Sequence, residues 1–213
     1  DLFEELVCNA FVRLSGKRVL DLPIVKALAS EKQLESLAAS DWRGVKLECD
    51  KVRVLGEAPD AAAFLRDNRN TLLSPEKVHR ADGVLLLGGG HILEVGCTLH
   101  SARVPSDDVL AQFASTASAG AYESAIAFAQ KSLPPGHPKR LNRHANAEKR
   151  RKAWVAAGLH ERRALRVHIT LPWGSEPADE DDVKDEQYAA GLFVLENGEI
   201  VVNLDKSNVH LLF

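Results

Sequence analysis

The sequence predicts one α/β domain in which helices flank a central sheet and a β-hairpin lies near the C-terminal end. Three observations lead to this expectation. A chain of 213 residues that is 45% hydrophobic can bury one substantial core. Helix-like and strand-like patterns follow one another through the first half. Near the end of the chain, the turn signal Asn197-Gly198 separates two apolar runs.

Four elements are expected before the strongest strand signal. Apolar residues at helical spacing over residues 2–14 predict an amphipathic helix. A proline near the start predicts a second helix from Asp21 through Leu28, with a continuation to Leu37 as the longer alternative, because proline is favoured in the first turn. Residues 45–55 suggest a strand or a short hairpin, and a small helix is expected at 61–66.

The best strand signals of the first half are the runs Val84–Leu87 and Ile92–Thr98, which lie on either side of three glycines. Both runs are short and apolar and contain β-branched residues, as strands do. Because they are hydrophobic almost throughout, we expect them in the middle of the sheet.

The second half is expected to hold two helices, a strand and a hairpin, over residues 107–133, 145–157, 164–171 and 191–204 respectively. Pro134-Pro135-Gly136 ends the first helix, because proline cannot continue the helical hydrogen bonds. Gly158 is the expected cap of the second helix. Asn197-Gly198 is the preferred pair for a type I′ turn, which predicts the turn of the hairpin.

Two carboxylates mark the pair of apolar strands. Asp82 opens the first strand and Glu94 lies inside the second. An ionised acid in an apolar strand is costly unless it is paired or bound to a metal, so Glu94 needs a partner. Asp82 also fits ordinary turn chemistry. Hard cations such as Mg²⁺ select carboxylate oxygens, so Asp82 and Glu94 are candidate metal ligands of a phosphodiester-cleaving site.

Other residues near these strands have simpler explanations. Gly88-Gly89-Gly90 lacks the Gly-Lys-Ser/Thr that completes a phosphate loop. His91 and His100 do not have the spacing of a usual zinc site, and we expect surface or hydrogen-bonding roles for them. The three cysteines, Cys97 among them, show no paired spacing, which indicates reduced intracellular thiols.

Residues 139–166 contain ten Lys or Arg against only Glu148 and Glu161. Such a segment fits contact with the phosphates of DNA or RNA and is also compatible with nuclear targeting. Alternatively, it is a solvated face that pairs with the acidic segment 176–186, which we expect to be a surface loop. The candidate phosphate contacts are Lys139, Arg140, Arg143, Lys149, Arg150, Arg151 and Lys152.

The net charge and the lengths of the apolar runs limit the kinds of partner that we expect for this chain. The net charge of −3 predicts no strong overall attraction to nucleic acid, so local patches would decide such binding. No apolar run approaches the roughly 20 residues of a membrane span, and we expect no membrane partner. The chain begins at Asp1 and contains no methionine, which suggests that residues 1–213 are a single domain from a longer protein.

Six short segments carry a family resemblance. They are Leu2-Phe-Glu-Glu-Leu-Val, Leu20-Asp-Leu-Pro-Ile-Val-Lys-Ala-Leu, Ala81-Asp-Gly-Val-Leu-Leu-Leu, Glu94-x-x-Cys-Thr, Val109-Leu-Ala-Gln-Phe and the closing Asn208-Val-His-Leu-Leu-Phe. They cover the first half and the tail, and they resemble the C-terminal region of the retrotransposon hot spot (RHS) proteins of trypanosomes, which is related to the C-terminal domains of Crinkler effectors. The resemblance implies a restriction-endonuclease-like fold with a central mixed sheet, in a protein that usually has a preceding P-loop NTPase domain. It also implies nuclear residence, with an association with chromatin, transcription or RNA.

The resemblance also assigns roles to three acids. Metal-dependent nucleases with this fold carry Asp, a run of variable length and then Glu-x-Lys on adjoining strands. By this resemblance Asp82 and Glu94 would be metal ligands and catalytic residues. Glu5, or its neighbour Glu4, would join them from the first helix, and Mg²⁺ would be the cofactor of an active form.

This chain departs from the nuclease pattern at the lysine, where it has Gly96. Degenerate relatives often have Gln there. A basic residue from elsewhere, Lys46 or Lys51, would have to supply the missing charge. We therefore expect a nuclear module that binds DNA or RNA without cleaving it. The alternatives are an active Mg²⁺-dependent nuclease and a protein-interaction domain of a nuclear complex.

Overall fold

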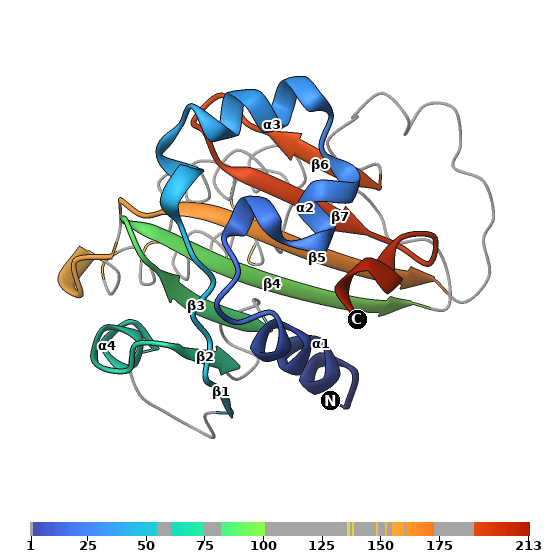
Figure 1. The fold of residues 1–213 in the computed structure, drawn as a ribbon. Helices are drawn as coiled ribbons and strands as arrows, with labels where there is room; N and C mark the ends of the chain where they lie inside the picture. The colour runs from blue at the N-terminus through green and yellow to red at the C-terminus, as the bar shows by residue number, and fades with distance from the viewer. Residues whose placement is uncertain are drawn as a thin grey trace.

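The computed structural model describes residues 2–54, 61–74, 82–100, 155–159, 161–172 and 190–213, together with Gly136, Pro138, Glu148 and Lys152. Its strands form one mixed sheet of seven strands in the order β1-β2-β3-β4-β5-β7-β6 (Figure 1). The strands are β1 (Lys51–Val54), β2 (Thr71–Ser74), β3 (Gly83–Leu87), β4 (His91–His100), β5 (Arg163–Pro172), β6 (Gly191–Val194) and β7 (Ile200–Leu204). The predicted α/β class with a sheet flanked by helices is confirmed.

The sheet combines an antiparallel part with a parallel part. β2, β3 and β4 form an antiparallel meander, whereas β4 with β5 and β5 with β7 pair in parallel. β1 lies at one edge as the parallel partner of β2, and β6 lies at the other as the antiparallel partner of β7. β3 and β4 therefore lie inside the sheet, as their apolar runs predicted.

Helices cover the sheet unevenly. The helical elements are α1 (Leu2–Arg13), η1 (Val19–Asp21), α2 (Pro23–Leu28), α3 (Glu31–Ala38), η2 (Asp41–Gly44), α4 (Ala61–Asp67) and η6 (Val209–Leu212). In Figure 1, α1, α2 and α3 lie over one face of the sheet. We call this the helix face, and we call the other side of the sheet the second face.

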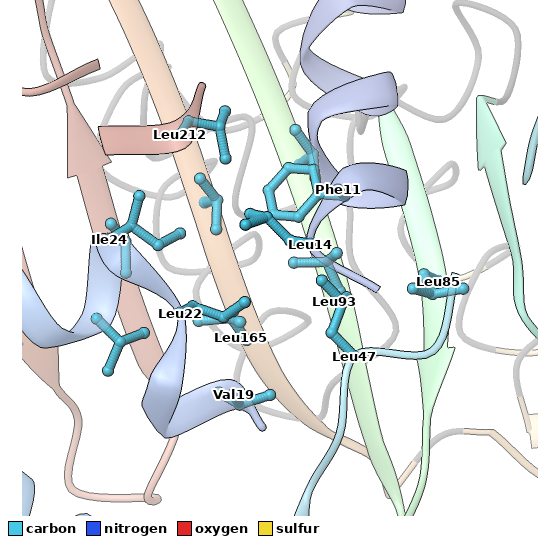
Figure 2. Close-up of a cluster of buried hydrophobic side chains, with 14 of the residues drawn as sticks. Phe11, Leu14, Val19, Leu22, Ile24, Leu47, Leu85, Leu93, Leu165 and Leu212 are labelled. Carbon is cyan, nitrogen blue, oxygen red and sulfur yellow. The ribbon is translucent and has the colours of Figure 1, made fainter. Parts of the chain in front are cut away.

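The main core lies between the helix face and the N-terminal helices. Phe11 of α1 is fully buried and packs with Leu93 of β4, while Leu22 lies over Leu165 of β5 (Figure 2). A fully buried aromatic side chain contributes about 3–5 kcal/mol when compared with alanine. Burial of this kind explains why the helical spacing over residues 2–14 correctly predicted α1.

The second predicted helix ends at Leu28, the shorter of its two expected bounds, and the residues up to Leu37 belong to a separate helix, α3. Ala29 and Ser30 have extended backbone between α2 and α3, with ψ of 139° and 160°. Ser30 then caps α3: its side chain accepts a hydrogen bond from the N–H of Gln33, whose side chain accepts one from Ser30. This reciprocal capping box satisfies two backbone donors and restarts the chain in a new direction.

Residues 45–55 contain less strand than expected. Only Lys51–Val54 forms a strand, and it is an edge strand rather than half of a hairpin. Val45 and Leu47 are held instead by backbone bonds to the segment after α1, at Val19 and Lys17. The predicted small helix is present as α4. The next strand, β2, has no counterpart among the sequence-based expectations.

The C-terminal hairpin is confirmed, but its turn differs from the expected type. β6 and β7 pair antiparallel, and the N–H of Gly198 donates to the carbonyl of Leu195 at 2.9 Å. A type I′ turn requires positive φ at both central residues, whereas only Gly198 has it, at +81°. The connection is therefore a three-residue loop with Gly198 in the left-handed position.

Several expectations concern segments outside the described residues. These are the helix at 107–133, the acidic segment 176–186 and most of the basic segment. Within 145–157, Glu148, Lys152 and Val155 are helical, and Gly158 has the left-handed φ of +71° expected for its cap. The strands expected at 84–87, 92–98 and 164–171 are present as β3, β4 and β5.

Candidate functional site

Glu94 lies in the centre of the sheet and is paired with an arginine. Strand alternation turns its side chain to the second face, because Leu93 and Val95 on either side belong to the main core. The parallel register sets Glu94 beside Arg166 of β5. Arg166 Nε donates to Glu94 Oε2 at 3.2 Å, and the two side chains are 5% and 4% exposed. The buried acid therefore has the partner that its position required.

Arg166 also contacts a second buried acid. Its Nη2 lies 3.0 Å from Oε2 of Glu199, whose side chain is 3% exposed, in a contact that is close but not aligned as a hydrogen bond. Glu199 directly precedes β7, which pairs with β5. The group Glu94, Arg166 and Glu199, which we call the buried ion cluster, links three neighbouring segments of the sheet across the second face.

The position at which the nuclease pattern has lysine lies two residues after Glu94 on β4. Gly96 aligns with His168 of β5, which in turn aligns with Asn203 of β7. His168 is buried, and this burial lowers its pKa to about 4, so the imidazole is neutral at physiological pH. Its Nδ1 lies 3.3 Å from Oγ1 of Thr170. Among the described residues that align with Gly96 in the sheet, none carries the expected positive charge.

Asp82 lies at the start of β3, beside α1. Its Oδ2 accepts a hydrogen bond from the N–H of Cys97 at 2.5 Å, and its own N–H donates to Val95 at 2.8 Å. Burial raises the pKa of Asp82 to about 6, the Cys97 hydrogen bond acts in the opposite direction, and the charge of Glu4 raises it further. Asp82 therefore belongs to an acidic group at the N-terminal helix.

The structure distinguishes the two candidate acids of α1. Glu4 is half-buried and its charge acts on Asp82, whereas Glu5 is exposed. The thiol of Cys8, one turn further along, contacts the carbonyl of Asp82 at 3.7 Å. Of the two glutamates, Glu4 is thus the one that the fold brings toward Asp82.

The three cysteines are free thiols, in agreement with their spacing. Burial raises the pKa of Cys8 to about 12, and the charges of Asp82 and Glu4 raise it further. Burial also raises the pKa of Cys49 and of Cys97. Because only a thiolate is a good nucleophile or metal ligand, these side chains act as apolar groups of the core.

The described residues do not assemble a shared metal site from the two predicted ligands. Glu94 is engaged by Arg166 on the second face, and Asp82 is bonded to the Cys97 amide beside α1. Across the described part of the chain, no three His, Cys, Asp or Glu side chains are grouped so as to hold a metal ion. Asp82 and Glu94 therefore do not fit a common Mg²⁺ ion.

The two substitute lysines lie elsewhere. Lys46 is exposed and forms an isolated bridge with Arg18. Lys51 is exposed on β1, which β2 and β3 separate from β4. Neither position is next to Gly96 in the sheet.

In the basic segment, Lys152 is the one candidate phosphate contact that the structure describes, and two of the last arginines form ion pairs. Lys152 is 72% exposed and lies 3.7 Å from Glu148, one helical turn away. The other six candidate phosphate contacts lie outside the described residues. Arg163 pairs with Asp41 at 2.6 Å, and Arg166 belongs to the buried ion cluster. These last arginines of the segment stabilise the fold.

His91 is a hydrogen-bonding residue as expected, but it is buried rather than on the surface. Its Nδ1 lies 3.2 Å from the carbonyl of Gly88, and its ring contacts that of Trp42 in a tilted arrangement, with the ring centroids 4.2 Å apart. Trp42 donates to the carbonyl of Gly198 at 2.8 Å, so the ring pair joins two hairpin turns. The side chain of His100 lies outside the described part of the chain.

Sequence reasoning missed Arg166, Glu199 and His168 as members of a polar group. Arg166 interrupts the apolar run Ala-Leu-Arg-Val as Glu94 interrupts Ile-Leu-Glu-Val. Two opposite charges, each alone in an apolar strand, predict a buried pair. This signal in the sequence indicates that each charge needs a partner, while the pairing of Glu94 with Arg166 depends on the register of β4 and β5.

Comparison with protein-family models, with curated proteins and with solved structures yields no match to this chain. The function is therefore argued from the site itself. In the described part of the chain, no helix has the length and apolar character needed to cross a bilayer.

Proposed function

We propose that this chain is a nucleic-acid-binding module of restriction-endonuclease-like descent whose metal site is degenerate, and that it acts on DNA or RNA in a nuclear transcription or chromatin context. The observation that carries the proposal is the arginine bound to Glu94. A guanidinium occupies the carboxylate that a Mg²⁺ ion would need, so the charge of Glu94 stabilises the sheet instead.

The order of elements supports the proposed descent. Helix α1 precedes the antiparallel meander β2-β3-β4, and β5 pairs with β4 in parallel. Asp82 opens the second strand of the meander and Glu94 lies in the third, as the family pattern requires. The ancestry rests on this order and on the resemblance described above, and the nuclear setting rests on the resemblance alone.

A second candidate is an active Mg²⁺-dependent nuclease, which the acid pair at α1 favours. Glu4 and Asp82 are close enough for their charges to interact. Magnesium ions in proteins are usually bound through one or two carboxylates, with water and substrate phosphates completing the coordination. In this alternative, Asp82 and Glu4 would bind the metal and Glu94 would not.

Binding and cleavage are separated by one set of experiments. Fluorescence anisotropy of labelled DNA and RNA oligonucleotides, in buffer with EDTA, should show binding that weakens as salt rises. The same oligonucleotides incubated with Mg²⁺ or Mn²⁺ should remain intact. Failure to bind either nucleic acid would overturn the proposal and favour a protein-interaction domain.

Cleavage, if it occurs, has its own control. Cutting that is lost in Asp82→Asn but retained in Asp50→Asn, an exposed acid outside the site, would establish the nuclease alternative. Cutting that survives Asp82→Asn and Glu94→Gln would indicate a contaminating nuclease. Neither result would change the binding measurement made in EDTA.

A further inference from the structure

One end of the sheet brings together a glycine loop and two arginines from distant segments. β3 ends at Leu87, β4 begins at His91, and β5 begins beside it at Arg163. β2 runs antiparallel to β3, so Arg69, just before β2, lies at the same end. Figure 1 shows the β3–β4 turn and the start of β5 together at this end of the sheet.

The glycine loop has exposed backbone donors. Gly88, Gly89 and Gly90 are all exposed, and Gly89 and Gly90 have left-handed φ of +66° and +79°. In the described chain, the N–H groups of Gly89 and Gly90 donate to no backbone carbonyl. Glycine at these positions allows the close approach of a ligand to the backbone.

Arg162 is fixed directly beside this loop. Its Nη1 donates to the carbonyls of Leu87 and His91 at 3.0 Å each, which are the two residues that flank the glycines. Its Nε is buried and has no hydrogen-bond partner among the described residues. The guanidinium is therefore held in one place beside the glycines, with its Nε shielded from solvent.

Arg69 adds a second positive charge. It is exposed and forms no ion pair with the described acids, and its charge lowers the pKa of Arg162, although burial of Arg162 is the larger cause. Nearby Asp67 is bound to Arg66 at 2.8 Å. Two guanidinium groups that repel each other, next to free backbone N–H groups, are a favourable environment for an anion.

We propose that the loop Gly88–Gly90, Arg162 and Arg69 form a phosphate-binding site that takes a backbone phosphodiester of a bound nucleic acid strand. This inference rests on the proposed nucleic-acid binding and assigns a contact to residues other than the candidates Lys139 to Lys152. Arg162 positions the loop and contacts the phosphate, and Arg69 supplies the second charge. The contact reads charge and backbone shape, and it does not read base sequence.

The test compares two single-charge variants. Arg69→Gln removes a charge at the site. Lys32→Gln removes the charge of an exposed side chain on α3, which lies near β6 at the other edge of the sheet (Figure 1). Oligonucleotide affinity is measured by anisotropy over a salt series. Loss of one phosphate contact should reduce the slope of log affinity against log salt by about one and weaken binding by about tenfold. Lys32→Gln should leave both unchanged.

A second measurement follows the loop itself. Inorganic phosphate is added to ¹⁵N-labelled protein, and the amide signals of Gly89 and Gly90 should shift in the wild-type chain but not in Arg69→Gln. Arg69→Gln and Lys32→Gln should both keep the urea midpoint of the wild-type protein, because both side chains are exposed. Arg162→Lys, which retains the charge but loses the clamp, should also lose the glycine shifts.

The outcomes separate the two proposals. If oligonucleotides bind and both variants weaken binding equally or not at all, the phosphate site is wrong and nucleic-acid binding stands. If oligonucleotides do not bind but phosphate shifts the glycine amides through Arg69, the proposed function fails and the anion site stands. If neither ligand binds, both proposals are overturned.

Discussion

At the scale of single residues, Arg166 holds two carboxylates that the sheet would otherwise bury without a partner. All three side chains are at most 5% exposed. Replacing such a pair with apolar groups is often tolerated, but removal of one partner leaves a buried charge uncompensated. The cluster therefore explains why neither Glu94 nor Glu199 is accessible as a ligand.

Arg166→Gln should lower the free energy of unfolding by about 3–5 kcal/mol, because Glu94 and Glu199 lose their shared cation. Urea unfolding followed by circular dichroism measures the change. Arg53→Gln, which removes an exposed arginine from edge strand β1, is the matched control and should have little effect. A loss below about 1 kcal/mol in Arg166→Gln would contradict a structural role for the cluster.

Asp82 gives the protein a pH dependence of defined sign. Its pKa in the folded chain is raised from 3.8 to about 6, so the folded state binds the proton more tightly than the unfolded state. The free energy of unfolding therefore falls as the pH rises from about 3.8 to about 6, and it stays reduced at higher pH. Asp82→Asn, which can still accept from the Cys97 N–H, should be more stable than wild type at pH 7.5.

The advantage of Asp82→Asn should shrink as the pH approaches 4, where the wild-type carboxyl is protonated. Urea midpoints of the two proteins at pH 4, 5, 6 and 7.5 measure this trend. His168, whose pKa is lowered to about 4, contributes the opposite slope, but it is present in both proteins and cancels in the difference. An advantage that grows at low pH would show that the assigned direction is wrong.

At the scale of elements, the turn of the β6–β7 hairpin depends on one glycine. Gly198 has φ of +81°, and a Cβ there would lie 3.3 Å from Nη1 of Arg163. Gly198→Ala should destabilise the protein by about 1–2 kcal/mol, because a left-handed backbone is unfavourable for alanine.

Gly44→Ala is the control for this prediction. Gly44 does not have positive φ, and a Cβ there would meet nothing within 4 Å. The substitution should be neutral or slightly stabilising through the unfolded chain. Thermal unfolding of both variants provides the comparison, and equal loss in the two proteins would argue against the observed turn.

Elements that carry a strong local signal were predictable. β3, β4 and β5 are apolar runs, and α1 has a clear helical spacing, so their positions followed from residue order alone. β2 was not predictable in this way, because it has only four residues and begins after Asn70, which takes the unusual φ of +58°. The break at Ser30 was left open between two helix bounds, although the Ser30–Gln33 capping signal was present.

The candidate site was predictable only in part. The position of Glu94 within an apolar strand required a partner, which the structure supplies. The identity of that partner depends on the parallel register of β4 and β5, which brings together residues 72 positions apart. No local pattern encodes such a pairing. The proximity of Arg69 to Arg162 could not be predicted either, because these residues also come from distant segments of the chain.

At the scale of the whole molecule, stability should decrease from the centre of the sheet to its edges. β4 and β5 pair on both sides and over ten residues with each other, whereas β1 and β6 are four-residue edge strands. Amides of β4, β5 and β7 should exchange with solvent only on global unfolding, and those of β1 much sooner. Hydrogen exchange followed by mass spectrometry tests this order, and protection of β1 equal to that of β4 would refute it.

The long β4–β5 ladder also has a consequence for synthesis. As the chain leaves the ribosome, the antiparallel meander emerges well before β5. Until β5 has been made, the edge of β4 that pairs with it is apolar and has no partner. Such edges are the sites where nascent chains associate with one another. Chaperone demand during translation should therefore be greatest in the interval between the two strands and should end when β5 closes the sheet.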